Sequence, residues 1–428
     1  MARNSDLEVL LFPVFLVLFF TIISSKPYMV SASIEETNAL LSWKASFANQ
    51  TQSLLPSWNL LSHNTCTWFG ISCNSAGSVI NISITSFGLN GTLHEFSFSS
   101  FPNLKYVNLS TNSLFGIIPS QIAILSKLIY LDLSTNHFSG QIPPEIGLLT
   151  NLQVMYLVEN QLNGSIPLEI GHLKSLNDLA LYSNQLHGPI PASLGNLNNL
   201  AYLYLFDNSL SGSIPRELGN LISLTDLELS ENQLSGLIPE ELGNLISLIG
   251  LFLGSNQFTG SIPTSFANLI NLEYLSLTCN KLSSSIPQEI GNLMKLRWVR
   301  LSSNQFTGMI PYEIGKATQL QYINFSNNQL FGSIPSEFGL LTNLTRLDLS
   351  GLGFFTFYWL ILVVLLNGNR LTGDTSGLGP FELEALQDCE YKFMSKYVKV
   401  GSIKKEEVPV ADSESAAEEN EGKCSYSV

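Results

Sequence analysis

Aromatic and acidic side chains recur at a fixed spacing in the middle of this chain, and their types suit binding. They crowd four successive units between Tyr182 and Phe252. Rings bury apolar area and carboxylates pair with basic or amide groups, so together they can hold an extended peptide. A single strand tyrosine also fits ordinary β-propensity. The candidate ligand-binding residues are Asp178, Tyr182, Tyr202, Tyr204, Phe206, Asp226, Glu228, Phe252, Tyr274 and Trp298.

Motifs of catalysis do not accompany these residues. The sequence has no glycine-rich phosphate loop, no H-R-D catalytic loop and no nucleophile elbow. Cys279 lies beside Asn280, but the repeat places no histidine to activate its thiol. A formal charge of -14 argues against a nucleic-acid partner, which needs a basic surface. We therefore expect no enzyme, no catalytic residue, no metal site and no cofactor.

The elements that position the candidate residues repeat every 24 residues from Phe101 onward. Leucines follow the pattern L-x-x-L-x-L, as in Leu224, Leu227 and Leu229, and this alternation predicts one short strand per unit with its leucines inward. An Asn follows three residues later, where its amide can bond to turn backbone and form a ladder. These are Asn112, Asn136, Asn160, Asn184, Asn208, Asn232, Asn256, Asn280, Asn304 and Asn328. Units must stack to bury their leucines, which predicts an α/β solenoid.

The amino-terminal segments predict secretion and a capped array. Residues 1–32 combine Arg3, an apolar run and small residues ending at Ala32, as a secretory signal peptide does. In an oxidising compartment Cys66 and Cys73 are close enough in sequence to form a disulfide. Ser33 and Glu36 predict a capping box that begins a helical cap over 33–75. The array then covers 76–350, with one degenerate, ten regular and one interrupted unit.

Seven N-glycosylation sequons lie beyond the signal segment. They are Asn49, Asn81, Asn90, Asn108, Asn163, Asn324 and Asn343. Asn108 and Asn324 occupy strand positions that face away from the core. Glycans there would obstruct both ends of the concave face and leave the middle units open, so we expect a ligand footprint from Asp178 to Trp298.

Residues from Ser33 to about Ser350 resemble plant leucine-rich-repeat receptor-like proteins and kinases. The resemblance rests on the cap EETNALLSW, on W-x-G-I-x-C from Trp68 to Cys73, and on repeats of the form L-x-G-x-I-P-x-x-L-G-N-L. It is strongest to the group of male-discoverer-interacting receptor-like kinases. It implies a plant-type leucine-rich-repeat solenoid that reaches the plasma membrane or apoplast through the secretory pathway. It also implies a secreted peptide or protein ligand and a co-receptor kinase.

A second class of function stays open beside the receptor. Inhibitors of cell-wall-degrading enzymes, similar to polygalacturonase-inhibiting proteins, also use about ten plant-type repeats. They end in a cysteine-stapled cap that the sequence lacks, so the receptor is the first expectation and the inhibitor is the alternative.

The unit that follows the ten regular ones is interrupted by an apolar segment over 351–367. One interpretation is an insertion into a repeat, because joining LDLS to the later GNRLTG would restore the pattern. The other is a single-pass membrane anchor, although the 15 residues from Leu352 to Leu366 give only about 22 Å of helix for about 30 Å of hydrocarbon. Residues 368–428 then hold a residual repeat fragment and an acidic tail expected to be disordered.

Overall fold

The computed structural model describes residues 32–48, 52–61, 64–349 and 351–352. The chain divides into two units, Met1–Thr372 and Gly373–Val428, and every described residue belongs to the first. The predicted signal segment up to residue 31, the sequon at Asn49 and everything after residue 352 therefore lie outside the described residues. This includes most of the predicted apolar segment and the whole of 368–428.

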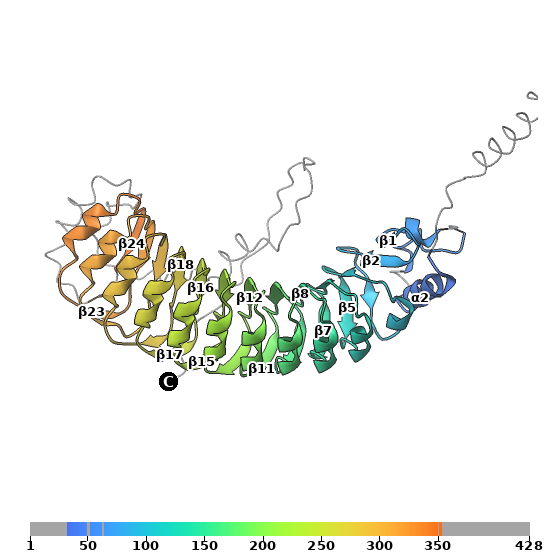
Figure 1. The fold of residues 1–428 in the computed structure, drawn as a ribbon, viewed down its shortest axis with the longest axis horizontal. Helices are drawn as coiled ribbons and strands as arrows, with labels where there is room; N and C mark the ends of the chain where they lie inside the picture. The colour runs from blue at the N-terminus through green and yellow to red at the C-terminus, as the bar shows by residue number, and fades with distance from the viewer. Residues whose placement is uncertain (1–31, 49–51, 62–63, 350, 353–428) are drawn as a thin grey trace, which may run out of the picture. The chain divides into compact units, whose positions relative to one another are not determined.

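Each 24-residue unit contributes one three-residue strand to a sheet of 13 strands, and Figure 1 shows this sheet along the inner side of the curved array. The sheet begins with β1 (Ile71–Cys73), antiparallel to β2 (Val79–Ser83), and continues in parallel. The remaining strands are β4 (Tyr106–Asn108), β6 (Tyr130–Asp132), β8 (Val154–Tyr156), β10 (Asp178–Ala180), β12 (Tyr202–Tyr204), β14 (Asp226–Glu228), β16 (Gly250–Phe252), β18 (Tyr274–Ser276), β20 (Trp298–Arg300), β22 (Tyr322–Asn324) and β24 (Arg346–Asp348). Each strand pairs with the strand of the next repeat in the same register, so equivalent residues lie side by side.

The returning half of each unit forms a second ladder and a short 3₁₀ helix, which the strand pattern alone did not predict. Nine strands form the second sheet: β3 (Asn90–Gly91), β5 (Ser113–Gly116), β7 (His137–Gln141), β9 (Gln161–Gly164), β11 (Gln185–Gly188), β13 (Ser209–Gly212), β15 (Gln233–Leu237), β17 (Gln257–Gly260) and β19 (Lys281–Leu282). A separate pair joins β21 (Thr307–Gly308) to β23 (Gln329–Leu330). Figure 1 places β11, β15 and β17 on the outer side.

The 3₁₀ helices connect this second ladder to the next inner strand. From η3 onward each begins directly after the proline of its repeat. Proline suits the position because its fixed φ leads into a helical turn and its missing N–H is not needed there. They are η2 (Phe98–Ser100), η3 (Ser120–Ile124), η4 (Pro144–Leu148), η5 (Leu168–His172), η6 (Ala192–Asn196), η7 (Arg216–Asn220), η8 (Glu240–Asn244), η9 (Thr264–Asn268), η10 (Gln288–Asn292), η11 (Tyr312–Lys316) and η12 (Ser336–Leu340). A further 3₁₀ helix, η1 (Thr65–Thr67), lies ahead of β1.

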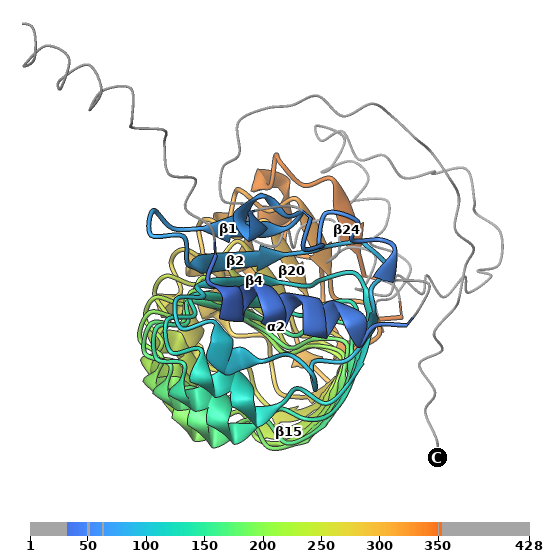
Figure 2. The same ribbon diagram turned by 90° about the vertical axis from the view of Figure 1, so that its right-hand side faces the viewer.

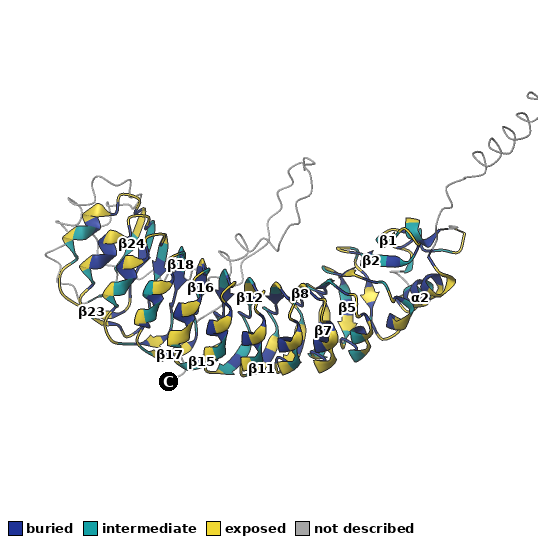
Figure 3. Cartoon of the chain, viewed as in Figure 1, coloured by how far each residue is buried: buried dark blue, intermediate teal, exposed yellow. Residues whose placement is uncertain are grey.

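The repeated leucines form one continuous core between the two ladders. Leu203, Leu227 and Leu251 are the central residues of neighbouring inner strands, and all three are fully buried. Figure 3 shows buried and exposed residues alternating through every unit. Because each buried leucine contributes roughly 1.5–3 kcal/mol only when its neighbours cover it, the stability comes from stacking.

The predicted asparagine ladder is confirmed, and each amide joins two repeats. Asn256 Nδ2 donates to the Leu229 carbonyl of the preceding unit at 2.9 Å, and also to Leu253 O and Gly254 O. Its Oδ1 accepts from Leu234 N at 3.0 Å. The side chain therefore satisfies turn backbone that no strand partner reaches.

The residue before each ladder asparagine adopts a left-handed backbone conformation. These ten residues have φ between 50° and 57°: Thr111, Thr135, Glu159, Ser183, Asp207, Glu231, Ser255, Cys279, Ser303 and Asn327. Non-glycine residues rarely adopt this φ, and the stacked hydrogen bonds hold it, as from Thr135 N to Val158 O at 2.8 Å. Every inner strand therefore ends in the same turn.

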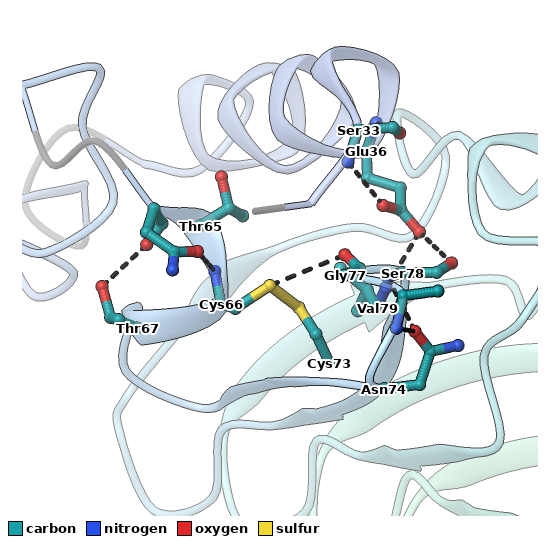
Figure 4. The surroundings of a disulfide bond; sticks show 12 residues. Ser33, Glu36, Thr65, Cys66, Thr67, Cys73, Asn74, Gly77, Ser78 and Val79 are labelled. Carbon is teal, nitrogen blue, oxygen red and sulfur yellow. Dashed lines mark hydrogen bonds between the residues drawn. A yellow bond between two sulfur atoms is a disulfide. The ribbon is translucent and has the colours of Figure 1, made fainter. Parts of the chain in front are cut away.

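The amino-terminal cap consists of α2 (Ile34–Ala45), which Figure 2 shows lying across the first end of the array. The predicted capping box is present, since Ser33 Oγ accepts from Glu36 N and Glu36 Oε2 accepts from Ser33 N. The predicted disulfide between Cys66 and Cys73 is also present (Figure 4). Glu36 Oε1 accepts from Val79 N at 2.9 Å, so the cap is fastened to β2 as well as to itself.

Candidate ligand-binding face

We call the inner face the first and third residues of each strand from β4 to β24, together with the residue two positions after each strand. These side chains point away from the leucine core because successive residues of a strand alternate. Register places equivalent residues beside one another: Asp178 is paired with Tyr202 and Tyr202 with Asp226. The predicted candidates thus lie along one surface from β10 to β20.

The candidates differ in exposure more than their positions suggested. Tyr202 is 38% exposed, the most open of them. Phe206 and Glu228 are 6% and 1% exposed, so the expectation that they are directly accessible is corrected. Glu228 Oε1 accepts from Ser230 N at 2.9 Å, which turns the carboxylate along the backbone. The partly exposed candidates are Asp178, Tyr182, Tyr204, Asp226, Phe252, Tyr274 and Trp298.

Phe206 is buried because aromatic rings of adjacent units cover one another. Tyr182 and Phe206 stack with ring centroids 4.2 Å apart and planes 12° apart. Tyr274 and Trp298 meet edge to face at 5.1 Å. Offset stacking and edge-to-face contacts are the favoured arrangements of aromatic pairs. The two aromatic pairs therefore hold their rings in fixed positions along the inner face, and we call these pairs the aromatic walls.

A further aromatic cluster adjoins the predicted footprint, at Tyr156, Val158 and Ala180, and Tyr130 and Tyr204 pack against it. Tyr156 is 6% exposed, and its ring lies 6.0 Å from that of Tyr130 at 84°. The footprint expected from sequence began at Asp178, so it left out Tyr130, Tyr156 and Val158. The strand register pairs Tyr130 with Val154 and Tyr156 with Ala180. This pairing was the signal for the cluster, because small and aliphatic neighbours leave room for the rings to pack against the sheet.

Two tyrosine hydroxyls bind carboxylates within this cluster. Tyr130 donates to Asp132 Oδ2 at 3.2 Å, and Tyr156 donates to Asp178 Oδ2 at 3.1 Å. Burial raises the pKa of Tyr156, and the nearby Asp178 charge raises it further. Burial also raises the pKa of Asp178, against a lowering by the Tyr156 hydroxyl. The phenols therefore stay protonated and act as hydrogen-bond donors.

Asp226 is a partly buried carboxylate at the start of β14. Burial raises its pKa from 3.8 to about 6, and no hydrogen bond to the carboxylate offsets this among the described residues. Burial and then the Asp226 charge raise the pKa of the neighbouring Tyr204. A carboxylate held this way gains most from a cationic or hydrogen-bond-donating group brought by a ligand.

The structure places the predicted glycosylation residues in different surroundings. Asn90, Asn163 and Asn343 are exposed, and Asn81 and Asn108 are partly exposed. Asn324 is 9% exposed; its Oδ1 accepts from Ser326 N and its Nδ2 donates to Tyr322 Oη at 3.2 Å. Glycosylation at these residues stays a prediction, and at Asn324 it requires those hydrogen bonds to open.

Within the described ranges, no helix has the length and apolar character needed to cross a bilayer.

The comparisons with known proteins agree with the repeat geometry. Residues 82–234 and 183–306 match the leucine-rich repeat region family, residues 33–74 the leucine rich repeat N-terminal domain, and residues 319–341 the leucine rich repeat. MDIS1-interacting receptor like kinase 2 of Arabidopsis thaliana is 47% identical over 129 residues, which are 29% of this chain and 12% of that protein.

One solved structure and one short sequence match are also similar to this chain. The Arabidopsis receptor kinase HAESA ectodomain, crystallised with an N-terminally extended IDA peptide hormone ligand, superimposes with a TM-score of 0.67 at 33% identity, covering 75% of this chain and 53% of that one. Membrane steroid-binding protein 1 of Oryza sativa subsp. japonica is 79% identical over 42 residues, 10% of this chain and 18% of that protein. The chain thus spans only part of each relative.

Proposed function

Because the chain belongs to the leucine-rich-repeat family and has the cap and repeats of plant receptor ectodomains, we propose that it senses a secreted peptide on its inner face. It is then a non-catalytic ectodomain of a cell-surface receptor-like protein or truncated receptor-like kinase. The observation that carries this proposal is the row Asp178, Tyr202 and Asp226, in which an exposed ring stands between two carboxylates beside prearranged aromatic walls.

The rigid surroundings of Tyr202 favour a linear ligand. The stacked pair Tyr182–Phe206 follows β10 and β12, and the edge-to-face pair Tyr274–Trp298 begins β18 and β20; both keep their rings in place without a ligand. Anchors that need no ordering on binding lose little entropy, so they contribute more to affinity. Tyr202 and the walls together lie along several strands, which suits an extended chain that crosses the repeats.

A co-receptor kinase and a place at the extracellular side of the plasma membrane or in the apoplast belong to the same proposal. The HAESA complex supports the peptide ligand by analogy, since a receptor kinase ectodomain with this repeat architecture holds a peptide hormone. The co-receptor kinase and the location follow from the resemblance to receptor-like kinases. The alternative, a secreted inhibitor of cell-wall-degrading enzymes, uses the same solenoid with a protein as its target.

A matched pair of tyrosines tests the peptide-binding proposal. Tyr106 and Tyr202 are both 38% exposed and both begin an inner strand, but Tyr106 lies outside the footprint. The secreted full chain would be used to select binders from a display library of short random peptides. We expect Tyr202→Ala to weaken the selected peptides about tenfold or more, as an anchor residue does, and Tyr106→Ala to leave them unchanged.

Two results would contradict the proposal. One is that no peptide is enriched, or that enriched peptides bind Tyr202→Ala as tightly as the wild type. The other is that the full chain inhibits a polygalacturonase and is released into wall fluid without carbonate-resistant membrane association, which would favour the inhibitor.

A further inference from the structure

Charge is sorted by sign along the inner face. Each strand from β4 to β18, taken with the three residues that follow it, has no Lys, Arg or His, and together these segments contain seven acids. Four of the acids are on the inner face, Asp132, Asp178, Asp226 and Glu228, and three are in the turn that follows, Glu159, Asp207 and Glu231. Basic residues reach the inner strands only at Arg300 in β20 and Arg346 in β24. A ligand over the central repeats therefore meets one sign of charge.

The two acids that flank Tyr202, Asp178 and Asp226, have few hydrogen-bonding or charged partners among the described residues. Asp178 Oδ1 is buried without a hydrogen-bond partner among the described residues, and its Oδ2 accepts only from Tyr156. In the same part of the chain neither Asp178 nor Asp226 forms an ion pair. Burying carboxylate oxygens in this way costs free energy that a hydrogen-bonded cation would recover.

The surface between the two acids is aromatic. Tyr202 is the register partner of both Asp178 and Asp226, and its ring lies 6.1 Å from that of Tyr204. A ring face attracts a guanidinium or ammonium group, and an aromatic floor also accepts the proline-rich left-handed helix called polyproline II. Acid, aromatic and acid thus follow one another along a line that runs across the strands.

The spacing of this line selects a ligand conformation. Asp178 and Asp226 lie two strands apart, which is about 9.4–9.8 Å at the usual strand separation. In a polyproline II helix, residues three apart share a face and are separated by about 9.3 Å. In a flat strand, residues three apart point to opposite faces, and residues two apart are only about 6.6 Å apart. The spacing of the two acids therefore matches a polyproline II helix and not a flat strand.

Building on the proposed function, we infer that the ligand segment over β10, β12 and β14 is a basic polyproline II segment. It carries two cationic side chains three residues apart, one on Asp178 and one on Asp226, and the residues between them cover Tyr202. Asp178 Oδ1 gains a charged donor, and the Asp226 carboxylate gains a counter-ion in apolar surroundings.

Synthetic peptides with blocked ends test this inference on the secreted full chain. The probe is Pro-Pro-Arg-Pro-Pro-Arg-Pro-Pro; Pro-Pro-Arg-Pro-Arg-Pro-Pro-Pro has the same composition with the wrong spacing, and a third peptide carries Glu for Arg. We expect the first to bind about tenfold more tightly than the second, with no binding of the third. Asp178→Asn and Asp226→Asn should each weaken the first about tenfold, and Asp348→Asn on β24 should not.

The outcomes separate this inference from the proposed function. Equal affinity for the two arginine spacings, or unchanged binding by Asp178→Asn and Asp226→Asn, overturns the inference. Library peptides that require Tyr202 but contain no basic residue also overturn it and leave the proposed function standing. Failure of every peptide to depend on Tyr202 overturns the proposed function itself.

Discussion

Gly250 lies beside Asp226 across β14 and β16, and its missing side chain is what lets the Asp226 carboxylate fold down onto the sheet. A Cβ atom at Gly250 would collide with Asp226 Oδ1 and would lie 2.7 Å from Phe252 Cε2. In the other units from β4 to β24 this register position holds tyrosine, tryptophan, aspartate, valine or arginine. The glycine therefore leaves room for the buried position of the Asp226 carboxylate, and this burial raises its pKa.

Asp226→Asn is expected to stabilise the folded chain above pH 6. The folded pKa of Asp226 is about 6 and its ordinary value 3.8, so between these values the folded state holds the proton more tightly. Its contribution to the free energy of unfolding is therefore complete below pH 3.8 and falls as pH rises to about 6. We expect the variant to gain about 1–2 kcal/mol at pH 7, less than the full difference between a pKa of about 6 and one of 3.8 would give, because Asp226 is partly exposed and solvent screens its charge.

Urea unfolding of both proteins at pH 3.5 and pH 7 measures this effect. Equal differences between variant and wild type at the two pH values would show that the Asp226 carboxyl titrates normally.

Gly250→Ala should release Asp226 from its buried position. The obstructing atoms belong to side chains that can rotate, so we expect a loss of less than about 1 kcal/mol and a return of the Asp226 pKa toward 3.8. NMR titration of the Asp226 carboxyl carbon reads the pKa directly. Gly219→Ala is the contrasting variant, because its Cβ would meet the backbone carbonyl of Glu241, which cannot rotate away, and should cost about 1–3 kcal/mol.

Sequence periodicity predicted the elements that repeat in every unit. It did not predict the burial of individual side chains, which depends on their neighbours. The 24-residue spacing of Asn256 and its equivalents predicted the strand, the turn and the ladder, because the same residue type has the same structural role in every unit. The burial of Phe206 and Glu228 could not be predicted that way. It depends on individual contacts: Tyr182 of the preceding unit stacks on Phe206, and Ser230 N of the same unit donates to Glu228.

The left-handed turn residue was also missed, because no single residue type marks it. Thr135, Glu159 and Cys279 all adopt it, with φ of 52°, 51° and 51°. The conformation is imposed by stacking, so only the three-dimensional repeat reveals it.

Asn256→Ala should destabilise the array more than any exposed asparagine substitution. The side chain is 8% exposed and takes part in four hydrogen bonds to backbone. Its loss therefore leaves Leu234 N and carbonyl groups of two units without these hydrogen bonds. Buried backbone groups left without partners predict a loss of about 2–4 kcal/mol in urea unfolding. Asn271→Ala is the control, because Asn271 is more exposed and bonds only to Ile246 O and Lys295, and it should cost less than about 1 kcal/mol. Equal losses would mean that the ladder contributes no more than a surface amide.

Glu36→Gln should loosen the cap from β2 while leaving the repeats intact. Glu36 is 2% exposed and accepts from Ser33 N through one carboxylate oxygen and from Ser78 Oγ and Val79 N through the other (Figure 4). Glutamine keeps one acceptor oxygen, but its amide nitrogen faces a donor, so one side must lose its hydrogen bonds. Bonds to a charged acceptor contribute about 1.5–3 kcal/mol, and faster hydrogen exchange at the Val79 amide should report that loss. Glu35→Gln is the matched control, since Glu35 occupies the same first helical turn but is exposed. Unchanged exchange at Val79 in Glu36→Gln would show that the disulfide and the apolar contacts of α2 hold the cap without this carboxylate.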